Sequence, residues 1–273
     1  MPTLILSPTH HSESRILRKA AQGLGWSTFR FQGDGLPAFY SGESVDSAIY
    51  CTVPNAFVVA RQLDSFLLGC SSNWLPDLPE EFLKRTVMLC PLMEAKREEL
   101  RRFIKPALGK SFEAAVMTGS DLDSVASHLP DDLEVHAAEV VEWEVEYRCF
   151  AADQAVKTLS PYRRGETIFS GYDRPLAGPH EEEAEAQGFA NSVVEAVRCP
   201  RAFVLDVGKI KGRGWAVVES NECWGAAIYG CAPPAVLEVL LKANVSRTAA
   251  TEEDRLWDYA KHYFRACPHM KTG

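Results

Sequence analysis

The stretch VLDVGKIKGRGWAVVESNECWG, residues 204–225, has the pattern of a β-hairpin. Two apolar runs, AFVLDVGKI and WAVVESN, flank the tetrapeptide KGRG, which predicts antiparallel strands joined by a tight turn. We expect a two-residue turn at Gly212 and Arg213. Asp206 then lies directly opposite Glu219. The hairpin therefore predicts two carboxylates on one face of a sheet.

Two opposed carboxylates repel each other unless a cation neutralises them, because their Cβ atoms lie roughly 4.5–5.5 Å apart. Side chains alternate along a strand, so Asn221 lies on the same face as Glu219. Carboxylate and amide oxygens suit Mg²⁺, which takes its other ligands from water and nucleotide phosphates. Alternatively, Asp206 and Glu219 lie on a solvated face near Arg213 or a lysine, and the spacing leaves both interpretations open.

A second patterned strand is EVVEWEVEYRCF, residues 139–150. Glutamates and Arg148 alternate with apolar residues, so one face is charged and the other packed. If Asp153 and Gln154 form the next turn, Lys157 lies opposite Phe150 on the face of Arg148. Two cations could then bind phosphate oxygens. An exposed strand with mutually neutralising charges explains the pattern equally well.

A pair of lysines follows from FIKPALGKSF, residues 103–112. Lys105 ends a predicted strand and Lys110 begins the next. Lysines bind phosphate as point charges. Because close lysine pairs are common on protein surfaces, this pair alone does not predict a site.

The composition is that of an ordinary globular protein of one large or two closely packed domains. Its 273 residues are 46% hydrophobic and 24% charged, and the net charge of −8 argues against a nucleic-acid-binding surface. No apolar run reaches the roughly 20 residues that span a bilayer, and the first residues lack signal-peptide features. We expect a cytoplasmic protein without membrane contact. The eight cysteines form no CxxC pair, which predicts reduced thiols.

Three regions are predicted along the chain. Residues 1–98 alternate strand, helix and strand as a Rossmann-like α/β domain does, but they lack the GxGxxG of a dinucleotide site. Within them, FVVARQLDSFLLG is predicted to be one helix ending at Gly69. Residues 99–245 are predicted to be α+β. Residues 246–273 are predicted to form one C-terminal helix, capped by Thr251 and Asp254, which packs on the domain or forms an oligomer contact.

Taken in order, FIKP, EVVEWEVEYRCF, VLDVG and VVESNECWG resemble the motifs of the ATP-grasp superfamily, spread over residues 103–230. With EYRCF, LSPY and ESNxxWG, the set is similar to a clade of small bacterial ATP-grasp domains named for its characteristic arginines and lysine. The resemblance implies an ATP-grasp fold, in which two α+β subdomains clasp ATP, preceded by the α/β pre-grasp domain.

The resemblance also implies roles for individual residues. Lys105 would contact the ATP phosphates, and Arg148 the transferred phosphate or acyl phosphate. Adenine and ribose would be held by a hinge segment and a following acid, namely Glu139, Val140, Val141, Glu142 and Glu146. Mg²⁺ would be held by Asp206, Glu219 and Asn221. The long glycine-rich lid of many relatives is replaced by PALGKSF, where Lys110 would substitute for backbone amides.

The implied activity is an ADP-forming ligase that uses ATP and Mg²⁺ to join a carboxylate to an amine or similar nucleophile through an acyl phosphate. The carboxylate would belong to a small molecule or peptide, with Lys157, Arg163 and Arg164 as candidate contacts. A homodimer is an open alternative to a monomer. Two rival functions remain, a small-molecule kinase of the same fold and a nucleotide-binding module without turnover. The intact metal set argues against the second rival.

Overall fold

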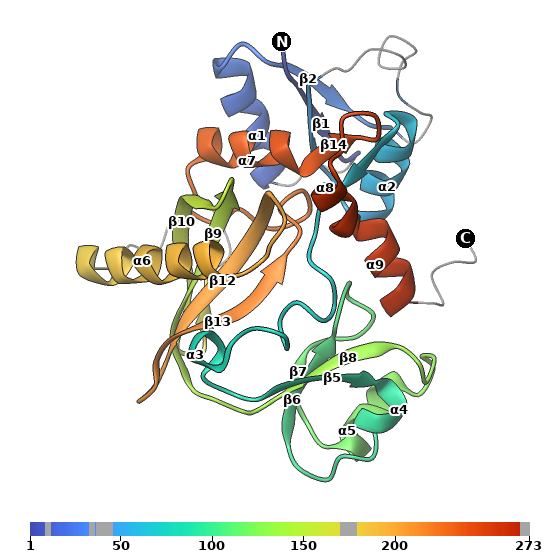
Figure 1. Ribbon diagram of the computed structural model, residues 1–273, viewed down its shortest axis with the longest axis vertical. Coiled ribbons are helices and arrows are strands. Elements are labelled where there is room, and N and C mark those ends of the chain that lie inside the picture. Colours follow the sequence, from blue (N-terminus) through green and yellow to red (C-terminus); the bar gives the residue numbers. More distant parts are fainter. Residues whose placement is uncertain (9–11, 33–35, 37–45, 170–178, 268–273) are drawn as a thin grey trace.

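The structure is a computed structural model, and it describes residues 1–8, 12–32, 36, 46–169 and 179–267 (Figure 1). The N-terminal sheet is parallel, with strand order β2-β1-β3. Its strands and connecting helix are β1 (Thr3–Leu6), α1 (Ser12–Gly23), β2 (Ser27–Arg30) and β3 (Ser47–Tyr50). The predicted order of strand, helix and strand is confirmed here.

The predicted helix ending at Gly69 is wrong in its second half. Helix α2 (Val53–Gln62) stops before Asp64, whose positive φ of 47° reverses the chain. The apolar residues that follow form β4 (Ser65–Leu67), which pairs with β14 (Asn244–Ser246). Gly69 has another reason to be glycine, because a Cβ there would lie 2.5 Å from the ring of Tyr259.

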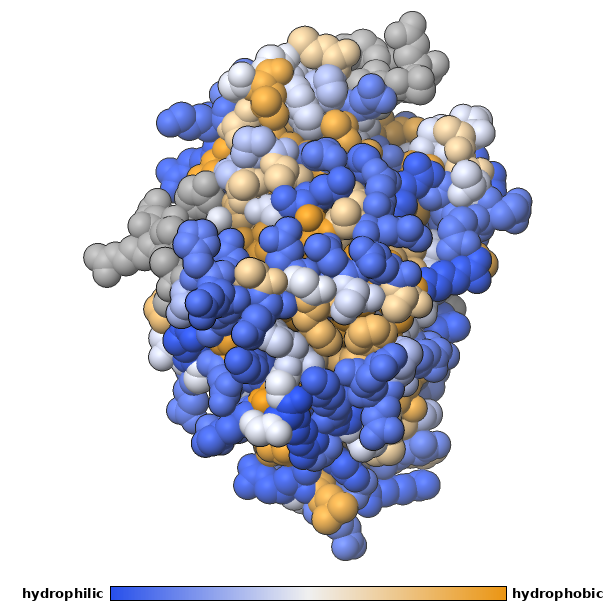
Figure 2. Space-filling model, turned by 60° about the vertical axis from the view of Figure 1, so that its left-hand side comes forward, coloured by the Kyte–Doolittle hydropathy of each residue, from blue (hydrophilic) through white to orange (hydrophobic). Residues whose placement is uncertain are grey.

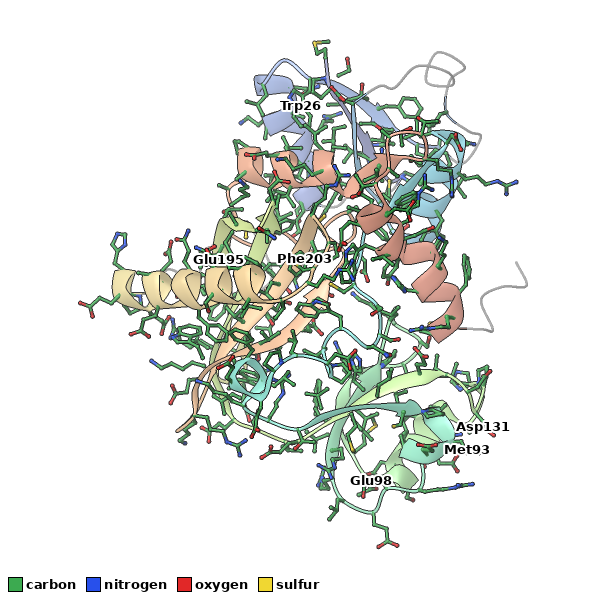
Figure 3. All side chains as sticks on the ribbon, viewed as in Figure 1. Trp26, Met93, Glu98, Asp131, Glu195 and Phe203 are labelled. Carbon is green, nitrogen blue, oxygen red and sulfur yellow. The ribbon has the colours of Figure 1, made fainter. Side chains whose placement is uncertain are left out.

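A small antiparallel sheet of order β5-β8-β6-β7 follows. It comprises α3 (Glu80–Leu83), β5 (Val87–Pro91), α4 (Leu92–Ala95), β6 (Arg102–Pro106), β7 (Ala115–Met117), α5 (Gly119–Ala126) and β8 (Glu134–Ala138). Glu98 and Asp131, labelled in Figure 3, mark the end of this unit that points away from the rest of the molecule. Thr118 and Asp121 form the capping box that starts α5, rather than the Ser120 that follows Thr118.

The large antiparallel sheet has the order β11-β10-β9-β12-β13. Its strands are β9 (Trp143–Ala152), β10 (Ala155–Arg164), β11 (Thr167–Ile168), β12 (Ala202–Ile210) and β13 (Gly214–Asn221). The predicted turn at Asp153 and Gln154 is confirmed, and both residues have positive φ as a type I′ turn requires. Helix α6 (His180–Ala196) covers one face, where Figure 3 labels Phe203 of β12 beside it. Helix α7 (Pro233–Ala243) lies against the other face.

The C-terminal segment forms two helices instead of the single one predicted. Helix α8 (Glu252–Leu256) begins at the predicted capping box of Thr251 and Asp254. The chain then breaks at Asp258, which forms a β-bridge with Leu68, and continues as α9 (Tyr259–Ala266). This bridge ties the C-terminal helices to the segment after β4.

Two apolar cores hold these elements together. One joins the N-terminal sheet, α7, α9 and part of the small sheet, and the other lies between the large sheet and α6. The face seen in Figure 2 is mostly hydrophilic, with hydrophobic residues in small areas between charged ones. In the part of the chain that the structure describes, no helix combines the length and the apolar character needed to cross a membrane.

Candidate active site

The candidate site lies on the α7 face of the large sheet, where β12 and β13 end opposite the small sheet. Asp206 is paired with Glu219, as predicted. The route to this register differs from the prediction, because Ile210 pairs with Gly214 and the turn therefore holds three residues. A bulge between the Asp206 and Val207 pairs then shifts the register by one residue. The two differences cancel at Asp206.

Asp206 forms a buried ion pair with Arg148 of the neighbouring strand β9. Arg148 Nε lies 2.9 Å from Oδ1 and Nη2 lies 2.6 Å from Oδ2, a bidentate geometry. Asp206 is fully buried, and Arg148 is 7% exposed. Burial raises the pKa of the Asp206 carboxyl, although the Arg148 guanidinium opposes that effect. The charge of each side chain is compensated within the protein.

Glu219 forms the second ion pair, with Lys105 at the end of β6. This contact joins the small sheet to the large one across the site. Burial acts to raise the pKa of Glu219, but Lys105, Asn221 and Arg148 outweigh it and lower the pKa to about 2. Glu219 is therefore ionised at neutral pH, and Lys105 is held where a phosphate could replace the carboxylate.

Asn221 links the two ion pairs. Its Nδ2 lies 3.1 Å from Asp206 Oδ2 and 2.9 Å from Glu219 Oε1. The three side chains thus converge on one point, as the hairpin predicted. No group of three His, Cys, Asp or Glu residues suited to a metal occurs within the described ranges. Two carboxylates and an amide oxygen nevertheless fit Mg²⁺, which needs few protein ligands when phosphates supply the rest.

A small cavity lies beside Glu219 and Lys105. It is also lined by Cys70, Ser71, Leu75, Ala107, Leu108, His136, Ser220, Asn221 and Glu222. His136 pairs with Lys105 in the sheet, and its Nε2 lies 2.7 Å from the carbonyl of Ser72. Burial and then Lys105 lower the pKa of His136 to about 4, so the imidazole is neutral at pH 7.

Two tyrosines surround the Arg148 guanidinium. Tyr162 of β10 stacks on Tyr229 with ring centroids 4.9 Å apart, and Arg148 lies over both rings. Glu13 of α1 accepts hydrogen bonds from the backbone amides of Ile228 and Tyr229. The first helix of the chain therefore holds the loop that carries Tyr229.

The hinge residues connect β8 to β9, and their acids contact the tip of the β12–β13 hairpin. Glu139 accepts hydrogen bonds from Arg213, and Glu142 from Lys211. Val140 is exposed and Val141 is half-buried. Glu146 is buried and bonded to Tyr162 and Arg163, so it is not free in this structure to bind a ribose.

Two predicted lysines lie away from the central ion pairs. Lys110 is exposed in the loop between β6 and β7 and does not begin a strand, because β7 starts at Ala115. A bulge in β10 places Thr158, not Lys157, opposite Phe150. Lys157 instead pairs with Glu238 of α7.

The two arginines after LSPY separate. Arg163 pairs with Glu146, on the Arg148 face. Arg164 pairs with Glu182 of α6, beside Tyr147 on the opposite face of the sheet. The structure therefore brings Arg163 toward the site and Arg164 away from it.

Sequence reasoning missed Arg85, which lies between α3 and β5. Its guanidinium donates to the carbonyls of Val217 and Val218 and lies over the Trp143 ring. It also missed His136 and Tyr229. The LSPY motif pointed to Tyr162, but no spacing in the sequence signals an arginine that binds backbone carbonyls.

A family model of the ATP-grasp domain matches residues 82–239, more than half of the chain. It describes family 2 of the clade named for its characteristic arginines and lysine. The chain belongs to this ATP-grasp family. The resemblance deduced from the motifs is confirmed, and all predicted phosphate, hinge and metal residues lie within the matched span. Comparison with curated proteins gives no match. The pre-grasp domain, whose predicted span of residues 1–98 lies mostly outside the match, stays a prediction.

Solved structures share the fold of this ATP-grasp protein. A RimK domain protein from Sphaerobacter thermophilus DSM 20745 is 14% identical with a TM-score of 0.54, and the match covers 88% of this chain and 98% of that one. The D-cycloserine synthetase DcsG gives the same four values. The ATP-grasp ligase PsnB, complexed with minimal precursor, is 12% identical with a TM-score of 0.50, covering 88% and 98%. At these identities the likeness shows the fold alone.

Proposed function

We propose that this ATP-grasp protein is an ATP- and Mg²⁺-dependent ligase that phosphorylates a carboxylate and transfers the acyl group to an amine or similar nucleophile, releasing ADP. One observation carries the proposal. Two ion pairs, Lys105 with Glu219 and Arg148 with Asp206, meet at Asn221 between the two sheets. Family membership and the named activities of DcsG and PsnB support it.

The ion pairs give a site that is neutral before ligands bind. ATP phosphates would attract Lys105 away from Glu219, which frees the carboxylate to act as a ligand. Mg²⁺, when bound by Asp206, Glu219 and Asn221, would neutralise phosphate charge and orient the phosphate groups. Lys105 and Arg148 would add positive charge at fixed positions, which is the main requirement of phosphoryl transfer.

Arg148 would act with its partners already in place. Its donors to Asp206 and to the carbonyl of Ala227 hold the guanidinium, and Tyr162 and Tyr229 restrict it further. Little side-chain entropy is then lost when an anionic phosphate or acyl phosphate binds. Arg163 is the better of the two candidate contacts for an anionic substrate, because Arg164 lies on the other face.

The proposal is tested by calorimetry of ATP binding with and without Mg²⁺. We expect Mg²⁺ to strengthen ATP binding by the wild type, and Glu219→Gln with Asn221→Ala to lose at least about tenfold of that gain. Asp206 is left intact because its loss would strand the buried Arg148 charge. Glu185→Gln, on exposed α6, is the matched control. ATP binding that ignores Mg²⁺ in the wild type would refute the metal site.

A second measurement separates ligase from kinase. Carboxylates are screened with ATP, Mg²⁺ and hydroxylamine, which captures an acyl phosphate as a hydroxamate. A ligase gives ADP and hydroxamate, whereas a kinase gives ADP and a stable phosphorylated hydroxyl. A module without turnover binds ATP and releases no ADP with any substrate.

A further inference from the structure

The β13 bulge decides which face of the sheet carries Glu219. Val217 and Glu219 are two residues apart, so in a regular strand they would share a face. Val217 is fully buried in the apolar core under α6. Without the bulge, Glu219 would enter that core and leave the site. The extra residue, Val218, turns Glu219 and Asn221 toward Asp206 instead.

Arg85 binds the bulge from outside the sheet. β13 is the edge strand, so its outward carbonyls have no neighbouring strand to pair with. Arg85 Nη1 lies 2.5 Å from the carbonyl oxygen of Val217, and Nη2 lies 2.8 Å from that of Val218. Consecutive carbonyls of a regular strand point to opposite edges. One guanidinium can reach both only because the strand is bulged.

Other contacts fix the guanidinium itself. Arg85 lies 4.9 Å from the centroid of the Trp143 ring, and its Nη1 also reaches the carbonyl of Leu83. Trp143 in turn packs on Gly208, where a Cβ would lie 2.7 Å from the ring. Burial lowers the pKa of Arg85 to about 10, with Glu146, Glu219 and Glu139 opposing that effect, so the side chain stays charged at pH 7.

We propose that Arg85 is a positioning residue that holds the β13 bulge and thereby aims Glu219 at the metal site. The proposal rests on the proposed function, because Glu219 is there a ligand of Mg²⁺. Within the described ranges, the hydrogen bonds of the Arg85 guanidinium all go to backbone carbonyls rather than to a carboxylate. A planar fork with several donors can bridge two carbonyls, whereas a lysine ammonium is a single point.

The test compares Arg85→Lys and Arg85→Met with Arg198→Met, which removes an exposed ion pair to Glu253. ATP binding is measured by calorimetry with and without Mg²⁺, and backbone amide hydrogen exchange is followed for residues 216–221. We expect both Arg85 variants to keep metal-free ATP binding and to lose about tenfold or more of the Mg²⁺-dependent gain. Exchange at Val218 and Glu219 should accelerate. Arg198→Met should match the wild type.

The outcomes are distinct. If Arg85→Lys retains the Mg²⁺-dependent gain, or both variants lose metal-free ATP binding equally, Arg85 contacts the nucleotide or serves no positioning role, and the proposal is overturned. If the wild type itself shows no Mg²⁺-dependent binding, the proposed function fails and hydrogen exchange decides alone. Faster exchange confined to residues 217–220 then supports the structural link, and unchanged exchange overturns it.

Discussion

At the scale of single residues, His136 shows how the site constrains its surroundings. The imidazole is 5% exposed, and among the described residues its Nδ1 has no hydrogen-bond partner. Lys105 lies opposite it in the sheet. A second positive charge at this position would be poorly solvated and repelled, which explains why the pKa of His136 falls to about 4.

This low pKa predicts a loss of stability in acid. The folded-state pKa of about 4 is below the ordinary value of 6.5, so the unfolded chain takes up the proton first as pH falls. The wild type should lose up to about 3 kcal/mol relative to His136→Gln between pH 6.5 and 4. Denaturant unfolding at a series of pH values measures it. His128→Gln, at an exposed site, should follow the wild type, and a pH-independent gap for His136→Gln would contradict the prediction.

At the scale of elements, the packing of β9 on β12 depends on Gly208. A Cβ there would lie 2.7 Å from Trp143 Cε3 and 2.8 Å from the carbonyl oxygen of Val145. Because one neighbour is backbone, the strands cannot easily yield. The displaced ring would also disturb Arg85, which lies over it.

Gly208→Ala should therefore lower the free energy of unfolding by about 1–3 kcal/mol, as overpacking does. It should also weaken Mg²⁺-dependent ATP binding. Thermal unfolding and calorimetry check both effects. The control is Gly188→Ala in α6, where nothing lies within 4 Å of the new methyl group. That variant should be stabilised by about 1 kcal/mol, because alanine favours helix.

Elements also show what the sequence could and could not predict. Asp206, Glu219 and Asn221 could be placed together because alternation is local and the hairpin fixes its own register. The bulge at Val218 could not, since it depends on Arg85 from a distant segment. The helix ending at Gly69 failed for a related reason. Its apolar residues fit a helix, but pairing of β4 with β14, which lies far along the chain, overrides the local preference.

At the scale of the whole molecule, α9 supports the loop that follows Lys105. Tyr263 packs against Gly109, where a Cβ would lie 2.9 Å from the ring, and Cys267 donates to the carbonyl of Leu108. Gly109 has a φ of +73°, so glycine is favoured there on two grounds. This loop is where many relatives have a long lid, and α9 lies outside the residues matched by the family model.

Tyr263→Ala should loosen the loop without altering any proposed ligand. We expect a loss of about 3 kcal/mol in stability, faster proteolytic cleavage near residues 107–114, and weaker ATP binding. Limited proteolysis with mass spectrometry locates the cleavage. Lys261→Ala, on the exposed side of α9, is the control. Cleavage that stays at wild-type rates in Tyr263→Ala would show that α9 does not restrain the loop.

The contacts of α9 have a consequence for biosynthesis. A ribosome adds about 5–20 residues each second, so Cys267 follows Gly109 by roughly ten to thirty seconds. During that interval the Lys105 loop and the aromatic surface around Phe57 and Trp224 lack the helix that covers them. The nascent chain therefore presents its site half-walled, and this exposed aromatic surface is where a chaperone would bind before the helix arrives.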